Sequence, residues 1–487
     1  MALPYYIQKN NLIRIVVLTV ITVACFLVVP TYSTPLHAST SDDYNVFVVM
    51  AQGWMEGLIP YRDLFDHKGP LLYLLQIAGL LIAPGKLGIW ILETLFAVIF
   101  LELLYQCGRA LRTSPSTNYI AMAVALLILL LTMQGGNNNE EWCLPFQALP
   151  LLLTFNFLKG GHPGIKTVAT VCGVCFGLVA MIRLNNNVII AGICLGQMII
   201  FLHERRYGEL LKSALFFILG TAIAILPFFI YFYSMDALRE MLYANFVFNV
   251  KYKMTWVAEY SSRIGIRYLW PCIVLPLMLL IFRKGNDSRL RVIMIAVSIV
   301  TFVTFITGTA YLHYYILASP IGALCILSVP KSWRIIPNLA VAAIVLGPIL
   351  STDSGSGRKH IVHTRDTETI DCRCHSEIIT SAIRQHIPTD ERESIYLSMS
   401  PGESSVLSPM EIFPTGKYFF LQYWLWVVDD RVSNDITVHF IEANPRWIIS
   451  NHTIENIHPL KEYANLYYIS TSMTVDNCNY YFYCRND

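Results

Sequence analysis

The sequence predicts an α-helical polytopic membrane protein with about 11 transmembrane helices and a small C-terminal α/β domain. Of its 487 residues, 55% are hydrophobic and only 14% are charged, whereas a soluble globular chain carries roughly 25% charged residues. Residues 1–351 hold 24 Lys and Arg against 15 Asp and Glu, and residues 352–487 hold 11 against 18. So few charges cannot coat the surfaces of several soluble domains, and so apolar a chain is not disordered. A conventional cytosolic enzyme is therefore excluded.

Eleven apolar runs approach the roughly 20 residues that a helix needs to cross the hydrocarbon core. They fall near 12–31, 88–108, 117–134, 144–158, 167–182, 187–202, 211–233, 269–282, 291–308, 314–329 and 335–350. A further run at 71–83 is too short to span easily, so we expect it to lie along the interface or to re-enter. No cleavable signal peptide is evident, and we expect the first run to be a retained span.

The distribution of Lys and Arg predicts the orientation of the chain in the membrane. With the N-terminus in the cytoplasm, the cytoplasmic loops hold 15 basic residues against three acidic ones. The loops 32–87, 135–143 and 234–268 then share one external face with the C-terminal region. We therefore expect a multi-pass protein of the bacterial cytoplasmic (inner) membrane that works at its outer, periplasmic surface.

The C-terminal region is expected to be a separate external domain. The polar, Gly- and Ser-rich stretch 352–370 predicts a linker between a membrane domain of 1–351 and an α/β domain of 371–487. A helix is expected near 375–386, and strands are expected at 394–399, 447–450, 466–470 and 480–484. Four cysteines lie at the two ends of this domain: Cys372, Cys374, Cys478 and Cys484. An oxidising compartment favours disulfides between them, while free thiols remain open and the spacing does not fit a usual zinc site.

The densest polar cluster lies in the first external loop. Its candidate site residues are Asp42, Asp43, Arg62, Asp63, Asp66, His67 and Lys68. A carboxylate held near apolar surface has a raised pKa and is suited to act as a general base. Arg62 and Lys68 are suited to bind a phosphate. The structural alternative is a solvated loop anchored by its aromatic residues.

Three further clusters are predicted on the same external face. Their candidate residues are Glu140, Glu141, Arg183, Asn185, His313 and Tyr314. Two carboxylates at the mouth of a helix bundle are costly unless they are solvated or paired. The structural alternatives are a polar hairpin, a snorkelling arginine and an aromatic belt. Glu93 and Glu102 inside the second span are weaker candidates, because intramembrane acids are often functional.

The first-loop motif resembles that of a known family. The chain has no P-loop, no Gly-rich dinucleotide fingerprint and no His-Glu-x-x-His motif. An acid just after the first span, followed by G-x-x-P-Y-R-D-x-x-D-H-K-G-P-L, resembles the GT-C superfamily of integral-membrane glycosyltransferases. The nearest branch is that of the bacterial protein-mannosyltransferase-like and aminoarabinose-transferase-like enzymes. The resemblance covers roughly residues 10–350.

The resemblance implies an enzyme that moves a sugar from a polyprenyl-phosphate donor to an acceptor hydroxyl, at the outer face of the membrane. Asp43 would match the catalytic base of the family, with Asp42 as the alternate. Glu140 or Glu141 would match the second-loop acid, and Lys68 the loop lysine.

The sequence leaves the partners of such an enzyme open. The acceptor could be a glycan, a lipid or a protein, membrane lipids would surround the chain, and no nucleic acid is expected. A divalent cation, Mg²⁺ or Mn²⁺, is possible, with Asp43 and Glu141 as its ligands if one is bound. Direct displacement assisted by a single base predicts inversion at the anomeric carbon.

Two other classes of function remain as alternatives. A transporter or flippase would show internal repeats and broken helices with a site at the midplane. A non-catalytic scaffold would tolerate loss of the loop acids. No repeat is evident and the polar residues gather on one face, which favours the glycosyltransferase.

Overall fold

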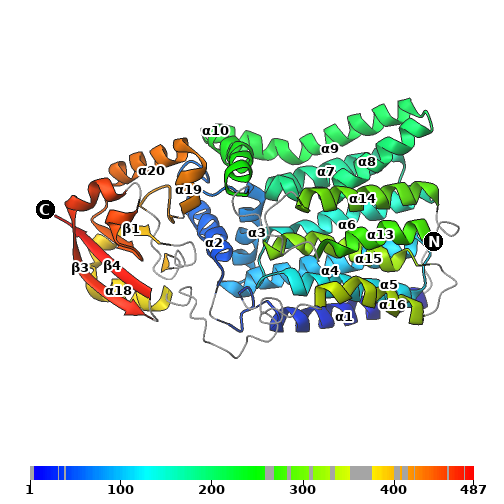
Figure 1. The fold of residues 1–487 in the computed structure, drawn as a ribbon, viewed down its shortest axis with the longest axis horizontal. Coiled ribbons are helices and arrows are strands. Elements are labelled where there is room, and N and C mark those ends of the chain that lie inside the picture. Colours follow the sequence, from blue (N-terminus) through cyan, green and yellow to red (C-terminus); the bar gives the residue numbers. More distant parts are fainter. Residues whose placement is uncertain are drawn as a thin grey trace. The chain divides into compact units, whose positions relative to one another are not determined.

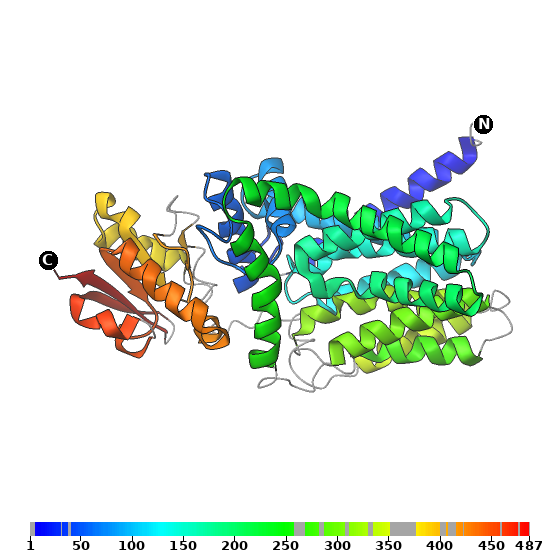
Figure 2. The same cartoon turned by 90° about the horizontal axis from the view of Figure 1, so that it is seen from above.

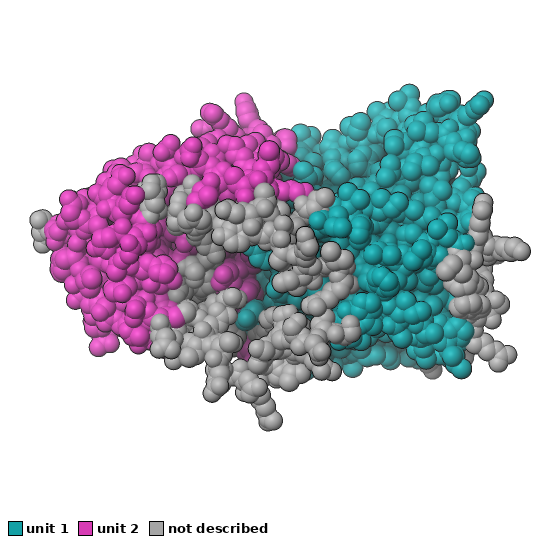
Figure 3. All heavy atoms as spheres, viewed as in Figure 1, with its two compact units in different colours: residues 1–36, 85–227, 261–364 teal, residues 37–84, 228–260, 365–487 magenta. Residues whose placement is uncertain are grey.

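The structure of the protein is a computed structural model that is mostly helical (Figure 1). It describes residues 5–30, 32–37, 40–257, 268–281, 287–306, 311–329, 335–350, 376–399, 406–407, 415–421, 423–457, 460–475 and 478–486. The chain forms two compact units, coloured separately in Figure 3. Unit 1 comprises residues 1–36, 85–227 and 261–364, and unit 2 comprises residues 37–84, 228–260 and 365–487.

Unit 1 is a bundle of long apolar helices that run side by side (Figures 1 and 2). They are α1 (Tyr5–Val28), α4 (Lys86–Ala110), α5 (Pro115–Thr132), α6 (Asn139–Leu158), α7 (Ile165–Arg183), α8 (Val188–His203), α9 (Tyr207–Ser234, which enters unit 2 at Phe228), α13 (Trp270–Ile281), α14 (Ser288–Ile306), α15 (Ser319–Leu327) and α16 (Ile335–Leu350). Each predicted apolar run falls in one of these helices, although α15 is preceded by a 3-10 segment over Leu312–Ala318. Among the described residues, six helices are long and apolar enough to cross a membrane unaided. The predicted polytopic membrane fold is confirmed.

Glycines bring two helix pairs of unit 1 into close contact. Gly192 lies on the face of α8 that packs on α14, and a Cβ there would lie 2.4 Å from the Cα of Val297. A Cβ on Gly173 of α7 would lie 2.0 Å from the carbonyl oxygen of Phe217 in α9, and one on Gly220 would lie 2.1 Å from that of Thr170. Small residues spaced in this way let the backbones of membrane helices approach each other.

Substitution of Gly173 by alanine is expected to destabilise the bundle. The new methyl group would overlap the α9 backbone, and overpacking of this kind typically costs about 1–3 kcal/mol. The measurement is the thermal unfolding midpoint of the purified protein in detergent. Gly347→Ala in α16 is the matched control, because a Cβ there meets no atom within 4 Å. An equal midpoint for both variants would contradict the close packing of α7 and α9.

Unit 2 contains most of the segment between the first two predicted spans, called the first loop below, and this segment is folded rather than extended. Helix α2 (Asp42–Met55) begins after Ser41, whose Oγ accepts a hydrogen bond of 3.1 Å from the backbone N–H of Tyr44. Helix α3 (Pro70–Ile82) begins with a proline in its first turn and matches the predicted interfacial run. Residues 56–69, which contain the charged motif, connect the two helices.

The segment predicted as the loop 234–268 is instead largely helical. It forms α10 (Leu238–Leu242), a π-helical turn (Tyr243–Phe248), α11 (Asn249–Tyr252) and a second π-helical turn (Lys253–Val257). Residues 258–267 lie outside the described residues. The segment is too short and too charged to cross a membrane, and for this reason the sequence analysis expected a loop where the structure has short helices.

The C-terminal part of unit 2 is an α/β domain, as predicted. It contains α18 (Ser376–His386), α19 (Tyr423–Val428), α20 (Asp430–Ala443) and strands β1 (Ile395–Ser398), β2 (Trp447–Ser450), β3 (Tyr467–Val475) and β4 (Cys478–Arg485). The sheet order is β1-β2-β4-β3, with β1 and β2 parallel and the other pairs antiparallel. Helix α20, which the sequence analysis missed, connects β1 to β2 in the chain and buries Val432, Ile436 and Phe440 at helical spacing.

The prediction for the four cysteines is partly wrong. Cys478 is disulfide-bonded, whereas Cys484 is a free, buried thiol near the other end of β4. Cys484 faces the interior, in register with Trp447 and Tyr468, and this position gives it no cysteine partner among the described residues. Cys372, Cys374 and the linker 352–370 lie outside the described residues, so the division of the chain at 351 and 371 stays a prediction.

Candidate active site

The first-loop candidates of unit 2 centre on a buried ionic cluster. Asp66, His67 and Lys68 are all buried although each is polar or charged. Lys68 Nζ lies 3.1 Å from His67 Nε2 and 3.9 Å from Asp66 Oδ1. Burial alone would raise the pKa of Asp66, but the charge of Lys68 and hydrogen bonds from His67 and Tyr73 outweigh it and hold that pKa well below its usual range. The cluster therefore presents the carboxylate of Asp66, ionised at neutral pH, beside the side-chain nitrogen of Lys68.

Aromatic and amide side chains fix the backbone of this cluster. The hydroxyl of Tyr73 donates to Asp66 Oδ2 at 2.8 Å, and the hydroxyl of Tyr61 donates to the Lys68 carbonyl at 2.7 Å. Asn249 Nδ2 donates to the His67 carbonyl at 2.8 Å. Tyr61 has a positive φ of 70°, which turns the chain sharply before the cluster. The sequence analysis did not select Tyr61, Tyr73 or Asn249.

Asp42 and Asp43 occupy the first turn of α2 and are half-buried. The positive end of the helix dipole stabilises carboxylates at this position. Both acids are thus held on a rigid element, whereas the sequence analysis placed them in a loop.

Arg62 and Asp63 form a more exposed pair. Arg62 Nε donates to Asp63 Oδ1 at 2.8 Å, and its Nη1 donates to the Met235 carbonyl at 2.9 Å. Asp63 Oδ2 accepts from the backbone N–H of Ile59 at 2.7 Å. These contacts hold the turn before Asp66 together and give Arg62 a structural role.

The candidates of unit 1 gather at the start of α6. Glu140 is fully buried, and its Oε1 lies 3.1 Å from Arg183 Nη1 at the end of α7. Arg183 Nη2 donates to the hydroxyl of Tyr314 at 2.6 Å, and the guanidinium lies 4.4 Å from the centre of the same ring. Three segments far apart in the sequence thus meet at Arg183.

Glu141 has a different environment from that of its neighbour. Its Oε1 accepts from Asn138 Nδ2 at 2.6 Å and from the Asn138 backbone N–H at 3.3 Å, which closes a capping box on α6. Glu93 of α4 interacts with Glu141 and accepts from the backbone N–H of Asn137 at 2.7 Å. Glu93 therefore belongs with Glu141 near the start of α6. Glu102 does not, because it pairs with Arg14 at 2.7 Å.

The remaining candidates of unit 1 are less closely connected. Asn185 is exposed, whereas Asn186 is buried and its Nδ2 donates to Asn139 Oδ1 at 2.9 Å. His313 is buried, and its Nδ1 lies 2.7 Å from Gln134 Oε1. The sequence analysis gave a polar hairpin as the alternative here, and did not recognise that Asn138 holds Glu141 and that the backbone of Asn137 holds Glu93.

Tyr314→Phe is expected to destabilise unit 1 modestly. The change removes the hydroxyl that accepts from Arg183 and keeps the ring under the guanidinium, and a hydrogen bond to a charged group is worth about 1.5–3 kcal/mol. Thermal unfolding of the purified variant measures the loss. Tyr311→Phe, in the same segment and half-exposed, is the control. An unchanged unfolding midpoint for Tyr314→Phe would remove the Arg183 contact as a stabilising interaction.

A metal centre is not preformed in the part of the chain that the structure describes. No group of three or more His, Cys, Asp and Glu side chains there could hold a metal ion. Asp43 and Glu141, the possible ligands from the sequence, belong to different units.

The helical bundle, the folded first loop and the C-terminal sheet together define a polytopic membrane protein with two buried charged clusters. Solved structures of one protein share this architecture over almost the whole chain. ArnT from Cupriavidus metallidurans bound to undecaprenyl phosphate matches with a TM-score of 0.60 and 13% sequence identity, covering 98% of both chains. The apo state of that ArnT matches with a TM-score of 0.58, the same identity and the same coverage.

Other comparisons give no match: neither a protein-family model nor a curated protein sequence matches this chain. The chain therefore has the ArnT fold. This fold agrees with the one that the first-loop resemblance implied.

Proposed function

We propose that the protein is a membrane glycosyltransferase that takes a sugar from a polyprenyl-phosphate donor. The observation that carries this proposal is the shared fold, over 98% of both chains, with an ArnT that binds undecaprenyl phosphate. The motif between α2 and α3 supports it as well, because Lys68, which matches the loop lysine in the family resemblance, is buried beside the carboxylate of Asp66.

The chemistry needs a base and a cationic site for phosphate. We assign Asp43 to take the proton from the acceptor hydroxyl as that oxygen bonds to the anomeric carbon. The bond from that carbon to the phosphate oxygen breaks in the same step, and the polyprenyl phosphate leaves with the electron pair. Lys68 is the candidate to stabilise the charge on the leaving phosphate. Attack opposite the leaving group inverts the anomeric carbon.

Glu140 is a poor candidate for the base. Its carboxylate is fully buried and paired with Arg183, and withdrawing it from that pair would leave an uncompensated charge. We propose that the cluster around Arg183 shapes unit 1 for the donor, and that Glu141 and Glu93 act together as a separate pair near the start of α6. No step of this proposal requires a divalent cation.

The orientation follows from the charge bias of the loops. We propose that the N-terminus is cytoplasmic and that the first external loop and the C-terminal domain lie outside the inner membrane. Cysteines placed at Ser41 and Ser354 in a cysteine-free background should both react with an impermeant reagent added to intact cells. Protection of either cysteine would reject the orientation.

The experiment that tests the function is a turnover assay. The purified protein is incubated with polyprenyl-phosphate sugars and with lipid, glycan and peptide acceptors, and loss of donor is measured together with labelled product. We expect donor loss that depends on one acceptor class. Movement of the donor across proteoliposome membranes without any bond cleavage would instead establish a flippase.

A further inference from the structure

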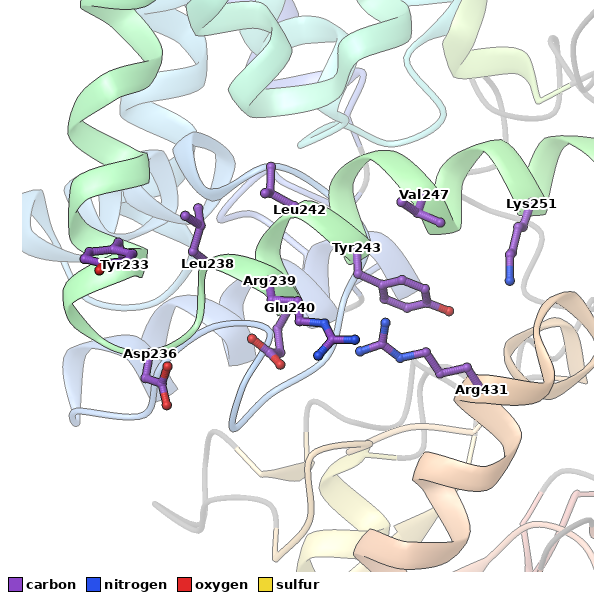
Figure 4. Close-up of a pocket in the computed structure, with 10 residues that line it drawn as sticks. All are labelled: Tyr233, Asp236, Leu238, Arg239, Glu240, Leu242, Tyr243, Val247, Lys251 and Arg431. Carbon is purple, nitrogen blue, oxygen red and sulfur yellow. The ribbon is translucent and has the colours of Figure 1, made fainter.

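Unit 2 contains a cavity of about 900 Å³ that the proposed chemistry does not use. Figure 4 shows the residues that line it, which come from the end of α9 and the turn after it, from the helical segment 238–257 and from α20. They are Tyr233, Asp236, Leu238, Arg239, Glu240, Leu242, Tyr243, Val247, Lys251 and Arg431. None of the first-loop candidates is among them.

Arg431 is held in place by an aromatic ring and has no acid of its own. Its guanidinium lies 4.0 Å from the centre of the Tyr243 ring. The neighbouring carboxylate, Asp429, is already occupied. It accepts hydrogen bonds from the Tyr243 hydroxyl, from Lys251 Nζ at 2.7 Å and from the Arg431 backbone N–H at 3.1 Å. The guanidinium charge of Arg431 is therefore not neutralised by Asp429.

A second arginine faces the first across the cavity. Figure 4 shows that the guanidinium ends of Arg239 and Arg431 point toward one another, while the carboxylate of Glu240 lies on the far side of Arg239. Among the described residues, neither guanidinium forms an ion pair with a carboxylate. Two facing guanidinium groups repel each other, and an anion between them removes that repulsion and gains charge-assisted hydrogen bonds.

An exposed apolar stripe continues from the cavity along the same helical segment. Val247 lines the cavity and is 47% exposed, and Val250 and Met254 are 60% and 74% exposed. Their spacing of three and four residues places them on one helical face. Asp236 and Glu240 also line the cavity and Lys251 is paired with Asp429, so the site for an anion is the pair of facing guanidinium groups. Such a pair beside the apolar stripe matches a ligand with an anionic head and a hydrocarbon chain, whereas a fully soluble anion would leave the stripe bare.

We propose that this cavity is a binding site for an anionic amphiphile, with its phosphate held between Arg239 and Arg431. The hydrocarbon chain lies along Val247, Val250 and Met254. The site is separate from the Lys68 cluster and does not depend on the sugar-transfer reaction.

Calorimetric titration of the full-length protein in neutral detergent tests the proposal. The probes are dihexanoyl phosphatidic acid, dihexanoyl phosphatidylcholine and inorganic phosphate. We expect phosphatidic acid to bind at least about tenfold more tightly than either of the other two, because only it combines a phosphate with both free charge and a chain. If inorganic phosphate bound as tightly as phosphatidic acid, the ligand would not need a hydrocarbon chain and the proposal of an amphiphile would be wrong. If phosphatidylcholine bound as tightly as phosphatidic acid, the site would not select a net negative charge and the proposal of an anion site would be wrong.

Two variants and a control locate the binding. Arg239→Ala removes an exposed side chain that has no ion pair among the described residues, so this variant should fold like the parent. We expect its affinity for phosphatidic acid to fall by about tenfold or more. Met254→Ser should weaken phosphatidic acid and leave inorganic phosphate unchanged. Lys461→Ala removes an exposed charge outside the cavity and should bind like the parent. Affinity for phosphatidic acid that is unchanged in Arg239→Ala would overturn the site.

Discussion

Asp43→Asn is expected to lower the rate of sugar transfer by about 10²–10⁴-fold, because a general base contributes about that much to such a reaction. The asparagine has nearly the same shape but takes up no proton at neutral pH. The purified variant is compared with the parent in the donor-loss assay. We expect the kcat to fall while the KM for the donor stays close to that of the parent.

Asp42→Asn is the matched control for this prediction. Both acids lie in the first turn of α2, so each change removes a similar helix-dipole contribution of about 0.3–1 kcal/mol. The two variants should therefore unfold at similar temperatures, and only Asp43→Asn should lose turnover. A parent-like rate in Asp43→Asn together with a large loss in Asp42→Asn would transfer the role of base to the neighbouring residue.

Hydropathy predicted the membrane part of the fold well because each span carries its own signal. The run 335–350, for example, coincides with α16 (Ile335–Leu350). In the C-terminal domain, the strand predicted at 447–450 likewise coincides with β2 (Trp447–Ser450). The prediction of a loop over 234–268 was wrong because the helices in this segment are amphipathic and too short to be found by a search for spans. The sequence analysis missed helix α20 because only three of its residues, Val432, Ile436 and Phe440, form the buried face and the rest of the helix is largely polar.

The chemistry of the site was predictable by residue type and only partly by arrangement. The motif around Lys68 identified a charged cluster, and the structure buries it. The role of Glu93 depends on contact with Glu141 across more than forty residues of sequence, which no local pattern encodes. The same holds for Arg183 and Tyr314, whose hydrogen bond joins helices that are adjacent only in the folded chain.

Lys68→Met is expected to lower the free energy of unfolding by about 3–5 kcal/mol, because it leaves the buried carboxylate of Asp66 without its cation. The pH dependence gives the sign of the effect. In the parent the pKa of Asp66 is held low, so its contribution to stability is present above the unfolded pKa of about 4 and falls away as the medium becomes more acidic. In the variant burial is no longer offset by the lysine, and the pKa of Asp66 rises.

The thermal midpoints of parent and Lys68→Met should therefore converge as the pH is lowered from 7 to about 4, since the variant can protonate Asp66 at little cost. A gap that is constant across this range would show that the loss comes from packing and not from the unpaired charge. Either result leaves the catalytic role of Lys68 to be tested separately.

The double variant Asp66→Asn with Lys68→Met separates folding from function. Replacing both partners of a buried ion pair is often close to neutral for stability, so the double variant should recover most of the midpoint lost by Lys68→Met alone. If Lys68 serves only to neutralise Asp66, turnover should recover with it. If Lys68 stabilises the leaving phosphate, the double variant should be stable and still lack turnover, because methionine supplies no charge to the transition state. We expect the second result, since a pair of charges is costly to bury between α2 and α3 unless the reaction needs one of them.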